Sequence, residues 1–304
     1  MKIFYDFDHL GEIRNAVVTT GSFDGVHIGH KVILQRLKKL AAEIEGETVL
    51  ITFHPHPRKV LYPETAGKGL LLINSQREKI NLLQKAGLDN LIIVTFTLEF
   101  SKITSVEFVR NILLNKLHAR KIVIGFNHHF GHNREGDYDY LHELGKYYDF
   151  AVEEIPEQDI HNEFVSSTKI RKAILEGNIQ RANAYLDHEY FFIAPIKPAS
   201  DVLMPMGIQW FELIPEEEEK QITPPGVYAG SVLEDDRRIK VMVLIEETAQ
   251  GSRILLNAPE YDLSVLPEVN LAFHKKIRLT APGESGFDKS LLIQDIEDIR
   301  DLIY

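Results

Sequence analysis

The first half of the sequence alternates short apolar runs with longer amphipathic segments. The apolar runs are rich in Val, Ile or Phe and cover residues 16–20, 48–53, 90–95, 121–125 and the stretch around 150–155. Between and after them, apolar residues recur every three or four positions in 30–44, 75–86, 105–117, 138–148, 168–176 and 179–186. Parallel strands joined by crossover helices have this pattern. We therefore predict an α/β domain, with a parallel sheet of about five strands covered by helices.

The pattern changes after residue 186. From residue 190 to about 280 the apolar runs are short, and Pro and Gly mark the turns, which indicates a small antiparallel β-barrel. Residues 289–304 have helical spacing, so a C-terminal helix is expected to pack on the barrel. We place the two domains at 1–186 and 187–304. The acidic run 216–219 is typical of a solvated loop, and we give it no role.

Composition limits the classes of function. The chain has 304 residues, 44% apolar and 26% charged, as expected for a soluble globular protein of two domains. A net charge of -11 disfavours a general nucleic-acid binder. Because the chain has no Cys, disulfides, thiolate nucleophiles and thiolate metal sites are excluded. No run approaches the roughly 20 apolar residues of a membrane span, and residues 1–6 do not resemble a secretory signal, so we expect a cytoplasmic protein without a membrane partner.

The decapeptide GSFDGVHIGH lies directly after the first predicted strand and before the first long helix. Its glycines, Gly21, Gly25 and Gly29, let the backbone approach a ligand closely. A helix that begins near His30 points free N–H groups and its positive dipole end toward the turn, which favours phosphate. His27 and His30 can both donate to phosphoryl oxygens, where charge develops during nucleotidyl transfer. Alternatively, both histidines only cap the helix or serve the turn.

This decapeptide resembles the signature of the nucleotidylyltransferase superfamily, in the form found in bacterial FAD synthetases. That family usually joins an FMN adenylyltransferase domain to a riboflavin kinase domain. Further segments resemble the first of these domains in the same order: TFHPHP at 52–57, the loop 125–136, VSSTKIR at 165–171 and, more loosely, 72–89 and 100–117. The resemblance covers about residues 1–185. It implies a Rossmann-like nucleotidylyltransferase domain that uses ATP with Mg²⁺, FMN as acceptor and FAD as product.

The resemblance also implies roles for particular residues. The implied catalytic residues are His27, His30, Ser167, Thr168 and Arg171. The implied nucleotide or flavin contacts are Gly21, Ser22, Phe23, Asp24, Gly25, Gly29, His56, Gly125, Asn127, Phe130 and Arg134.

Two of these segments also have a direct physical interpretation. Residues 165–168 lead into a helix whose hydroxyls and free N–H groups can bind phosphate, and Arg171 follows one turn later with a guanidinium suited to bidentate binding. An ordinary N-cap followed by a surface arginine is the alternative. In 52–57, prolines stiffen the strand exit and present His54 or His56, either of which could instead satisfy a backbone carbonyl. We favour His56 because it matches the fixed histidine of the family motif.

The loop 125–136 allows two interpretations. Its three histidines, with Glu135 and Asp137 nearby, could be read as a metal site. Zinc ligands on one loop need spacings that let their side chains converge, and H-H-x-x-H lacks the helical partner spacing of known structural zinc sites. A flavin and nucleotide loop therefore fits better. Asn127 stands where the family usually has Asp. Magnesium can be held mostly by the ATP phosphates and water, so we assign no protein ligand to it.

The second half lacks the markers of riboflavin kinase. Residues 192–207 contain neither the Gly-rich entry nor P-T-A-N, and no catalytic Glu can be placed. Only 225–230 and 293–300 resemble a barrel strand and the terminal helix of that domain. The leading hypothesis is an FMN adenylyltransferase whose kinase domain is degenerate. The alternatives are a bifunctional enzyme, a flavin- or nucleotide-binding paralogue without catalysis, and adenylyl or cytidylyl transfer to another acceptor. The sequence does not define an oligomeric state.

Overall fold

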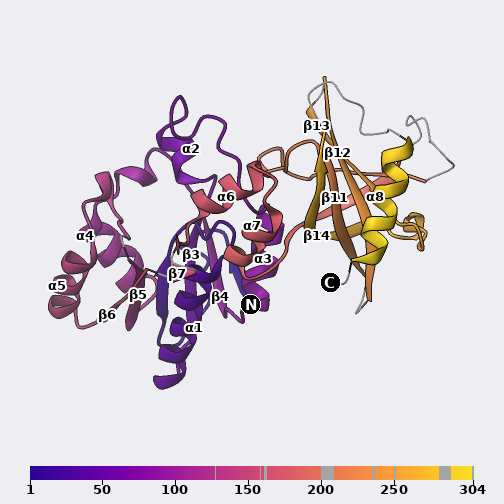
Figure 1. The fold of residues 1–304 in the computed structure, drawn as a ribbon. Coiled ribbons are helices and arrows are strands. Elements are labelled where there is room, and N and C mark those ends of the chain that lie inside the picture. The colour runs from indigo at the N-terminus through magenta and orange to yellow at the C-terminus, as the bar shows by residue number, and fades with distance from the viewer. Residues whose placement is uncertain are drawn as a thin grey trace. The chain divides into compact units, whose positions relative to one another are not determined.

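The computed structural model describes residues 1–126, 128–157, 159–160, 163–199, 209–234, 237–249, 251–280 and 289–302. The chain forms two compact units (Figure 1). The first consists of Met1–Leu70 and Lys79–Val165, and the second of Leu71–Glu78 and Ser166–Tyr304. The domain boundary predicted between residues 186 and 187 stays a prediction.

The first unit is built on a six-stranded parallel sheet with strand order β1-β4-β3-β2-β5-β6. Its strands are β1 (Lys2–Phe4), β2 (Val17–Thr20), β3 (Thr48–His54), β4 (Asn90–Thr95), β5 (Lys121–Gly125) and β6 (Ala151–Ile155). The predicted α/β class is therefore confirmed. The prediction of about five strands missed β1, which has three residues, none of them buried, and pairs with β4.

Helices cover both faces of this sheet. The helices of this part of the chain are α1 (Ile28–Glu43), α2 (Pro57–Leu61), α3 (Gln76–Lys85), η1 (Phe100–Lys102), α4 (Ser105–Glu107), η2 (Phe108–Leu114), η3 (His132–Arg134) and α5 (Tyr138–Tyr148). Successive strand residues alternate between two cores: Val17 packs with Leu37 of α1, and Val18 packs with Val109 of η2. A short hairpin, β7 (Asp159–Ile160) with β8 (Glu163–Phe164), ends the unit.

One predicted helix differs from the structure. The segment 105–117 was expected to be a single α-helix, but α4 is followed by the π-helix η2. The wider turn buries four apolar side chains of η2: Phe108, Val109, Ile112 and Leu113. Hydrophobic spacing alone does not distinguish this arrangement from an α-helix.

The second unit contains a closed antiparallel barrel with helices before and after it. The helices α6 (Ser167–Leu175) and α7 (Ile179–Leu186) precede it. The barrel strands are β9 (Tyr190–Pro198), β10 (Phe211–Leu213), β11 (Gly226–Glu234), β12 (Arg237–Thr248), β13 (Gly251–Asn257) and β14 (Glu268–Leu279), in the order β10-β13-β12-β11-β14-β9. After the turn η5 (Leu263–Val265) and β14 comes α8 (Lys289–Asp301), whose Leu292 and Ile299 pack with Met242 of β12. The predicted barrel and C-terminal helix are confirmed.

The segment Leu71–Glu78 belongs to the barrel unit through backbone bonds. Leu72 donates to the carbonyl of Glu219 at 2.7 Å and accepts from Gln221 at 2.7 Å. The acidic run 216–219 is therefore more than the solvated loop that we expected. Glu217 accepts the N–H of Gln76 at 2.7 Å, at the start of α3, and Glu216 pairs with Arg77 at 3.0 Å. In the part of the chain that is described, no helix has both the length and the apolar character of a membrane span.

Candidate functional site

The turn after β2 is held in an unusual backbone conformation. All residues of β2 are buried, and Gly21 continues the strand by donating to the carbonyl of Ile51 at 3.0 Å. Phe23, Gly25 and Val26 then adopt φ values of +48°, +87° and +39°, and Val26 donates to the Phe23 carbonyl at 3.2 Å. Positive φ is uncommon for residues other than glycine, and such positions cluster at functional sites. Phe23 and Val26 are 2% and 1% exposed, so their burial in the core holds this turn in place.

The two predicted histidines lie together at the start of α1. The ring of His30 is stacked between the ring of His27, at a centroid distance of 3.7 Å, and the ring of Phe23, at 4.4 Å. His27 occupies the N-cap position, where its carbonyl accepts from Lys31 at 2.9 Å and its side chain makes no capping bond. The first alternative, in which the His27 ring caps the helix, is therefore not what the structure shows.

The surroundings of His30 favour the neutral form of its ring. Burial, followed by the neighbouring charges of His27 and Lys79, lowers the pKa of His30 well below 6.5. Its Nδ1 atom is buried and has no hydrogen-bond partner among the described residues. A buried polar atom without a partner is costly, and a ligand that supplies a partner there removes this cost. The ring therefore fits a phosphate-binding role.

Lys79 is a residue of this region that the sequence reasoning missed. It is 8% exposed, and its ammonium nitrogen lies 3.4 Å from the Ser22 carbonyl and 3.5 Å from Oγ1 of Thr52. The Thr52 hydroxyl donates to the same Ser22 carbonyl at 3.2 Å. Lys79 stands four residues before the fully buried Leu83 on α3. This spacing puts the lysine on the apolar face of the helix. It is the sequence signal from which the burial of Lys79 could have been predicted.

His56 has a structural role at the end of β3. It is the N-cap of α2, and its Nδ1 accepts the N–H of Arg58 at 3.2 Å. In the neutral ring the proton therefore lies on Nε2, the atom that can donate to a ligand. His54, the other candidate, is exposed at the strand end. The predicted contact of His56 with nucleotide or flavin stays a prediction.

The loop 125–136 is closed at its base by a short backbone pairing. Phe130 and Gly136 exchange two hydrogen bonds of 3.0 Å each. A Cβ on Gly136 would lie 2.7 Å from the Phe130 ring, so only glycine fits there. Phe130 also packs on the core near Phe108, whereas Arg134 is exposed. Asn127 lies outside the described residues.

Polar residues of the same loop anchor it to the unit. Nδ1 of His132 lies 3.1 Å from the Ser101 carbonyl, and Glu135 accepts from the backbone and hydroxyl of Ser105 at 2.7 and 3.0 Å. These bonds lower the pKa of Glu135. Asp137 caps α5 by accepting from Tyr140 at 2.9 Å. Over the described ranges, no three His, Asp or Glu side chains are grouped as metal ligands would be.

The remaining predicted catalytic residues lie on α6, in the second unit. Ser166 is the N-cap of this helix, and its hydroxyl accepts from Lys169 at 3.4 Å. Ser167 is thus the first helical residue, and Arg171, one turn later, shares its face of the helix. Thr168 is exposed. The two histidines belong to the first unit.

A parallel sheet whose strand leads through a histidine-bearing turn into a helix N-terminus is an arrangement found in nucleotide-binding α/β proteins. The family model for FAD synthetase matches residues 10–169, more than half of the chain. The chain therefore belongs to the FAD synthetase family, and the resemblance stated from its motifs is confirmed.

Similar curated proteins support the assignment to this family. A bifunctional riboflavin kinase/FMN adenylyltransferase from Buchnera aphidicola subsp. Acyrthosiphon pisum is 36% identical over 187 residues, which cover 61% of this chain and 59% of the relative. An FAD synthetase from Listeria monocytogenes is 36% identical over 178 residues, 59% of this chain and 71% of that protein. The chain thus spans less than two thirds of the length of the first bifunctional relatives that it matches.

A solved structure shares the whole fold. The crystal structure of a protein described as a macrolide-efflux protein from Streptococcus pneumoniae has a TM-score of 0.84 and covers 99% of each chain. The two sequences are 23% identical, so this likeness shows the fold alone.

Proposed function

We propose that this chain is an FMN adenylyltransferase, which transfers the adenylyl group of ATP to FMN and releases FAD and pyrophosphate. The observation that carries the proposal is the stacked pair His27 and His30 at the N-terminus of α1. The pair lies within the segment 10–169 that matches the FAD synthetase family. The relatives named above are FMN adenylyltransferases or FAD synthetases, which supports the choice of FMN as acceptor.

The reaction is an in-line displacement at phosphorus. A phosphate oxygen of FMN attacks the α-phosphorus of ATP, and the bond from this phosphorus to the oxygen bridging to the β-phosphorus breaks as pyrophosphate leaves. Charge develops on the phosphoryl oxygens, so donors fixed in advance at these oxygens accelerate the reaction. The N–H groups of His27, His30 and the first turn of α1 supply such donors. Because FMN attacks the α-phosphorus directly, no covalent enzyme intermediate is needed.

MgATP is the expected form of the nucleotide, in which the metal neutralises phosphate charge and is held mostly by phosphates and water. Lys79 adds a fixed positive charge beside the turn, and its bond to the Ser22 carbonyl positions that turn. We assign the outer phosphates to Ser167, Thr168 and Arg171, because a helix N-terminus with hydroxyls and a guanidinium is suited to them. His56, Phe130, Arg134 and Asn127 remain proposed contacts of nucleotide or flavin.

We infer that the barrel unit has lost riboflavin phosphorylation. The support is the sequence 192–207, which lacks P-T-A-N and its glycine-rich entry, although the barrel itself is retained. FMN would then come from another protein, and a chain without Cys suits the reducing cytoplasm where we place the reaction. The bifunctional names of several relatives favour the alternative, in which both activities remain.

The test follows FAD and pyrophosphate by chromatography after purified protein is incubated with FMN and MgATP. His30→Ala and a reaction with riboflavin in place of FMN run in parallel. We expect FAD from FMN, none with His30→Ala, and no FMN from riboflavin. No FAD at all would reject the proposed transfer in favour of a binding paralogue or another acceptor. Conversion of riboflavin to FMN would instead establish a bifunctional enzyme.

A further inference from the structure

The boundary between the two units falls inside α3. Glu78 is the last residue of the segment that belongs to the barrel unit, and Lys79 is the first residue after it that belongs to the first unit. Both residues lie within one continuous helix. Successive residues of a helix share one hydrogen-bonded backbone, so a shift of the first turn also moves the residues that follow it. The contacts of Glu78 therefore affect where Lys79 lies.

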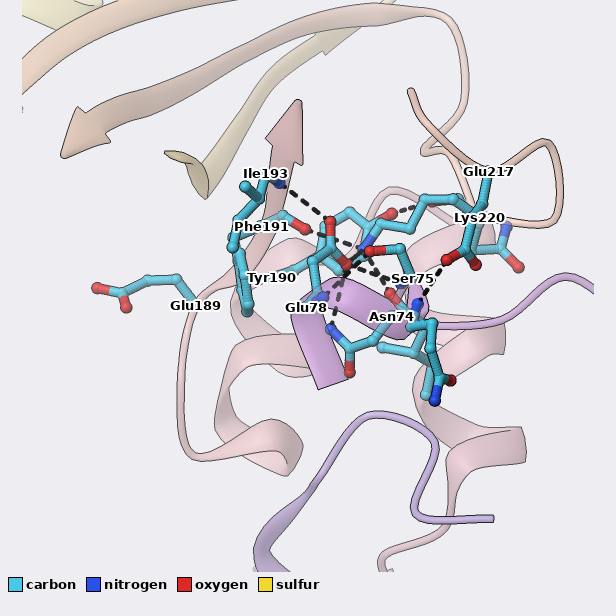
Figure 2. Close-up of polar contacts among 12 residues, drawn as sticks. Asn74, Ser75, Glu78, Glu189, Tyr190, Phe191, Ile193, Glu217 and Lys220 are labelled. Carbon is cyan, nitrogen blue, oxygen red and sulfur yellow. Dashed lines mark hydrogen bonds and ion pairs between the residues drawn. The ribbon is translucent and has the colours of Figure 1, made fainter. Parts of the chain in front are cut away.

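The first turn of α3 is fixed by the carboxylate of Glu78. This carboxylate accepts from the ammonium group of Lys220 at 2.6 Å, from the N–H of Ser75 at 2.9 Å and from the N–H of Ile193 at 3.1 Å (Figure 2). Glu78 is 1% exposed, so water does not compete for these bonds. Hydrogen bonds to a charged acceptor are short and strong, and a buried one holds its position closely. The start of α3 is thus set by the barrel unit.

The contacts of Lys79 with the turn after β2 are longer. Its ammonium nitrogen lies 3.4 Å from the Ser22 carbonyl and 3.5 Å from Oγ1 of Thr52. A well-formed N–H···O bond measures roughly 2.7–3.2 Å. Contacts of this length do not by themselves fix a flexible side chain with four methylene groups. The place of the ammonium group therefore depends on the backbone of α3.

We propose that Glu78 is a positioning residue for the transfer reaction, because its bonds to the barrel unit set the place of α3 and so hold the Lys79 ammonium beside the turn after β2. This inference rests on the proposed function, in which Lys79 supplies a fixed positive charge next to the phosphates of ATP. Glu78 takes no part in the chemistry and acts through the helix backbone. The barrel unit thereby contributes to adenylyl transfer whether or not it phosphorylates riboflavin.

The pKa of His30 reports where Lys79 lies. The charge of Lys79 is one of the causes that lower this pKa, after burial and the charge of His27. If Glu78→Ala lets Lys79 move away from the turn, the pKa of His30 rises. Loss of the Glu78 carboxylate by itself acts in the opposite direction, since removing a negative charge disfavours the imidazolium form. The sign of the change thus separates a displaced lysine from a lost carboxylate.

The test compares the full chain with Glu78→Ala, with Lys79→Met and with the double variant. Histidine ring signals are followed by NMR over a range of pH, and His30→Gln assigns the signal of His30. We expect Glu78→Ala to raise the His30 pKa, and to cause no further rise when it is added to Lys79→Met. Glu78→Gln keeps an acceptor for the same backbone N–H groups and should give a smaller rise. Glu218→Ala removes an exposed carboxylate of the acidic run, and this matched control should leave the pKa unchanged.

FAD synthesis by the same chains provides the second measurement. Glu78→Ala should lower kcat/KM about three- to tenfold, and should lower it no further in the chain that already carries Lys79→Met. An equal loss of kcat/KM in both backgrounds overturns the proposal, because Glu78 then acts independently of Lys79. A His30 pKa that Glu78→Ala leaves unchanged or lowers overturns it equally.

The NMR measurement needs no substrate, so its result holds even if no FAD is formed. A raised His30 pKa without FAD synthesis would support the coupling of Glu78 to Lys79 and reject only the proposed transfer. Circular dichroism verifies that each variant is folded. If Glu78→Ala does not fold, Glu78→Gln takes its place in both measurements, and a His30 pKa that does not rise in that variant overturns the proposal.

Discussion

The ammonium nitrogen of Lys220 lies 2.6 Å from Oε2 of Glu78, and both side chains are 2% exposed (Figure 2). Lys220 also donates to the carbonyls of Ile73 and Phe191, at 2.6 and 2.9 Å. Its charge lies over the rings of Tyr190 and Phe192, at 4.6 and 4.5 Å from their centroids. This buried cation is thus fully surrounded by acceptors and π-systems within the barrel unit.

The carboxylate of Glu78 is equally well satisfied. It accepts from the N–H of Ser75 at 2.9 Å and from the N–H of Ile193 in β9 at 3.1 Å (Figure 2). The pair therefore ties the segment Leu71–Glu78 to the barrel through side chains as well as through the backbone.

We expect Lys220→Met to lower the free energy of unfolding of the barrel unit by about 3–5 kcal/mol, because it leaves a buried carboxylate unpaired. Lys197→Met is the matched control, since Lys197 pairs with Glu212 at 3.4 Å but is 60% exposed. Its loss should cost less than about 1 kcal/mol. Urea unfolding measures both. If both variants lowered the free energy of unfolding equally, a structural role for the buried pair would be contradicted. The double variant Lys220→Met with Glu78→Gln should lose less unfolding free energy than Lys220→Met alone, because no buried carboxylate is left unpaired.

Binding of ATP should be accompanied by proton uptake at His30. The pKa of His30 lies well below 6.5 in the free protein because the ring is buried beside His27 and Lys79. A triphosphate next to the ring favours the charged imidazolium and raises this pKa. Calorimetry in buffers of different ionisation enthalpy, near pH 6, measures the protons bound. His30→Gln should remove most of the uptake, and an unchanged uptake in that variant would assign it to other groups.

Lys79→Met should reduce kcat/KM for FAD synthesis about tenfold or more, because it removes a fixed positive charge beside the phosphate turn. Lys85→Met, an exposed lysine on the same helix, is the control and should have little effect. Since the charge of Lys79 lowers the pKa of His30, the Lys79→Met variant should also show a higher His30 pKa by NMR. If Lys79→Met lowered kcat/KM only by disturbing the fold, this rise of the His30 pKa would not be expected. An unchanged kcat/KM would show that Lys79 has no part in the reaction.

The sheet and the turn after β2 could be predicted because their signals are local. Alternating apolar runs define the strands, and GSFDGVHIGH places a helix start directly after one of them. What could not be predicted depends on tertiary contacts. Strand β1 is too short to show a period, and the burial of Lys79 is set by its neighbours Ser22 and Thr52. The pairing of Leu72 with residues 219–221 joins segments about 150 positions apart, which no local pattern reports.

Stability should fall as the pH falls from about 6.5 toward about 4, partly because of His128. Burial, then the charges of His129 and Arg134, lowers the pKa of His128 to about 4. In the unfolded chain this pKa is about 6.5. Between these values the unfolded state binds a proton that the folded state does not, so the free energy of unfolding decreases as the pH decreases. Above pH 6.5 the contribution is complete and independent of pH.

The variants His128→Phe and His54→Gln separate this contribution from that of other titrating groups. The unfolding free energy of each is measured in urea at pH 7.5, 6 and 5. His128→Phe should lose stability less steeply than the unchanged chain over this range, because it has no imidazole to protonate on unfolding. His54→Gln replaces an exposed histidine and should keep the original slope. If His128→Phe also keeps that slope, the ring is solvated in solution and the loop 125–136 is more open than its backbone pairing implies.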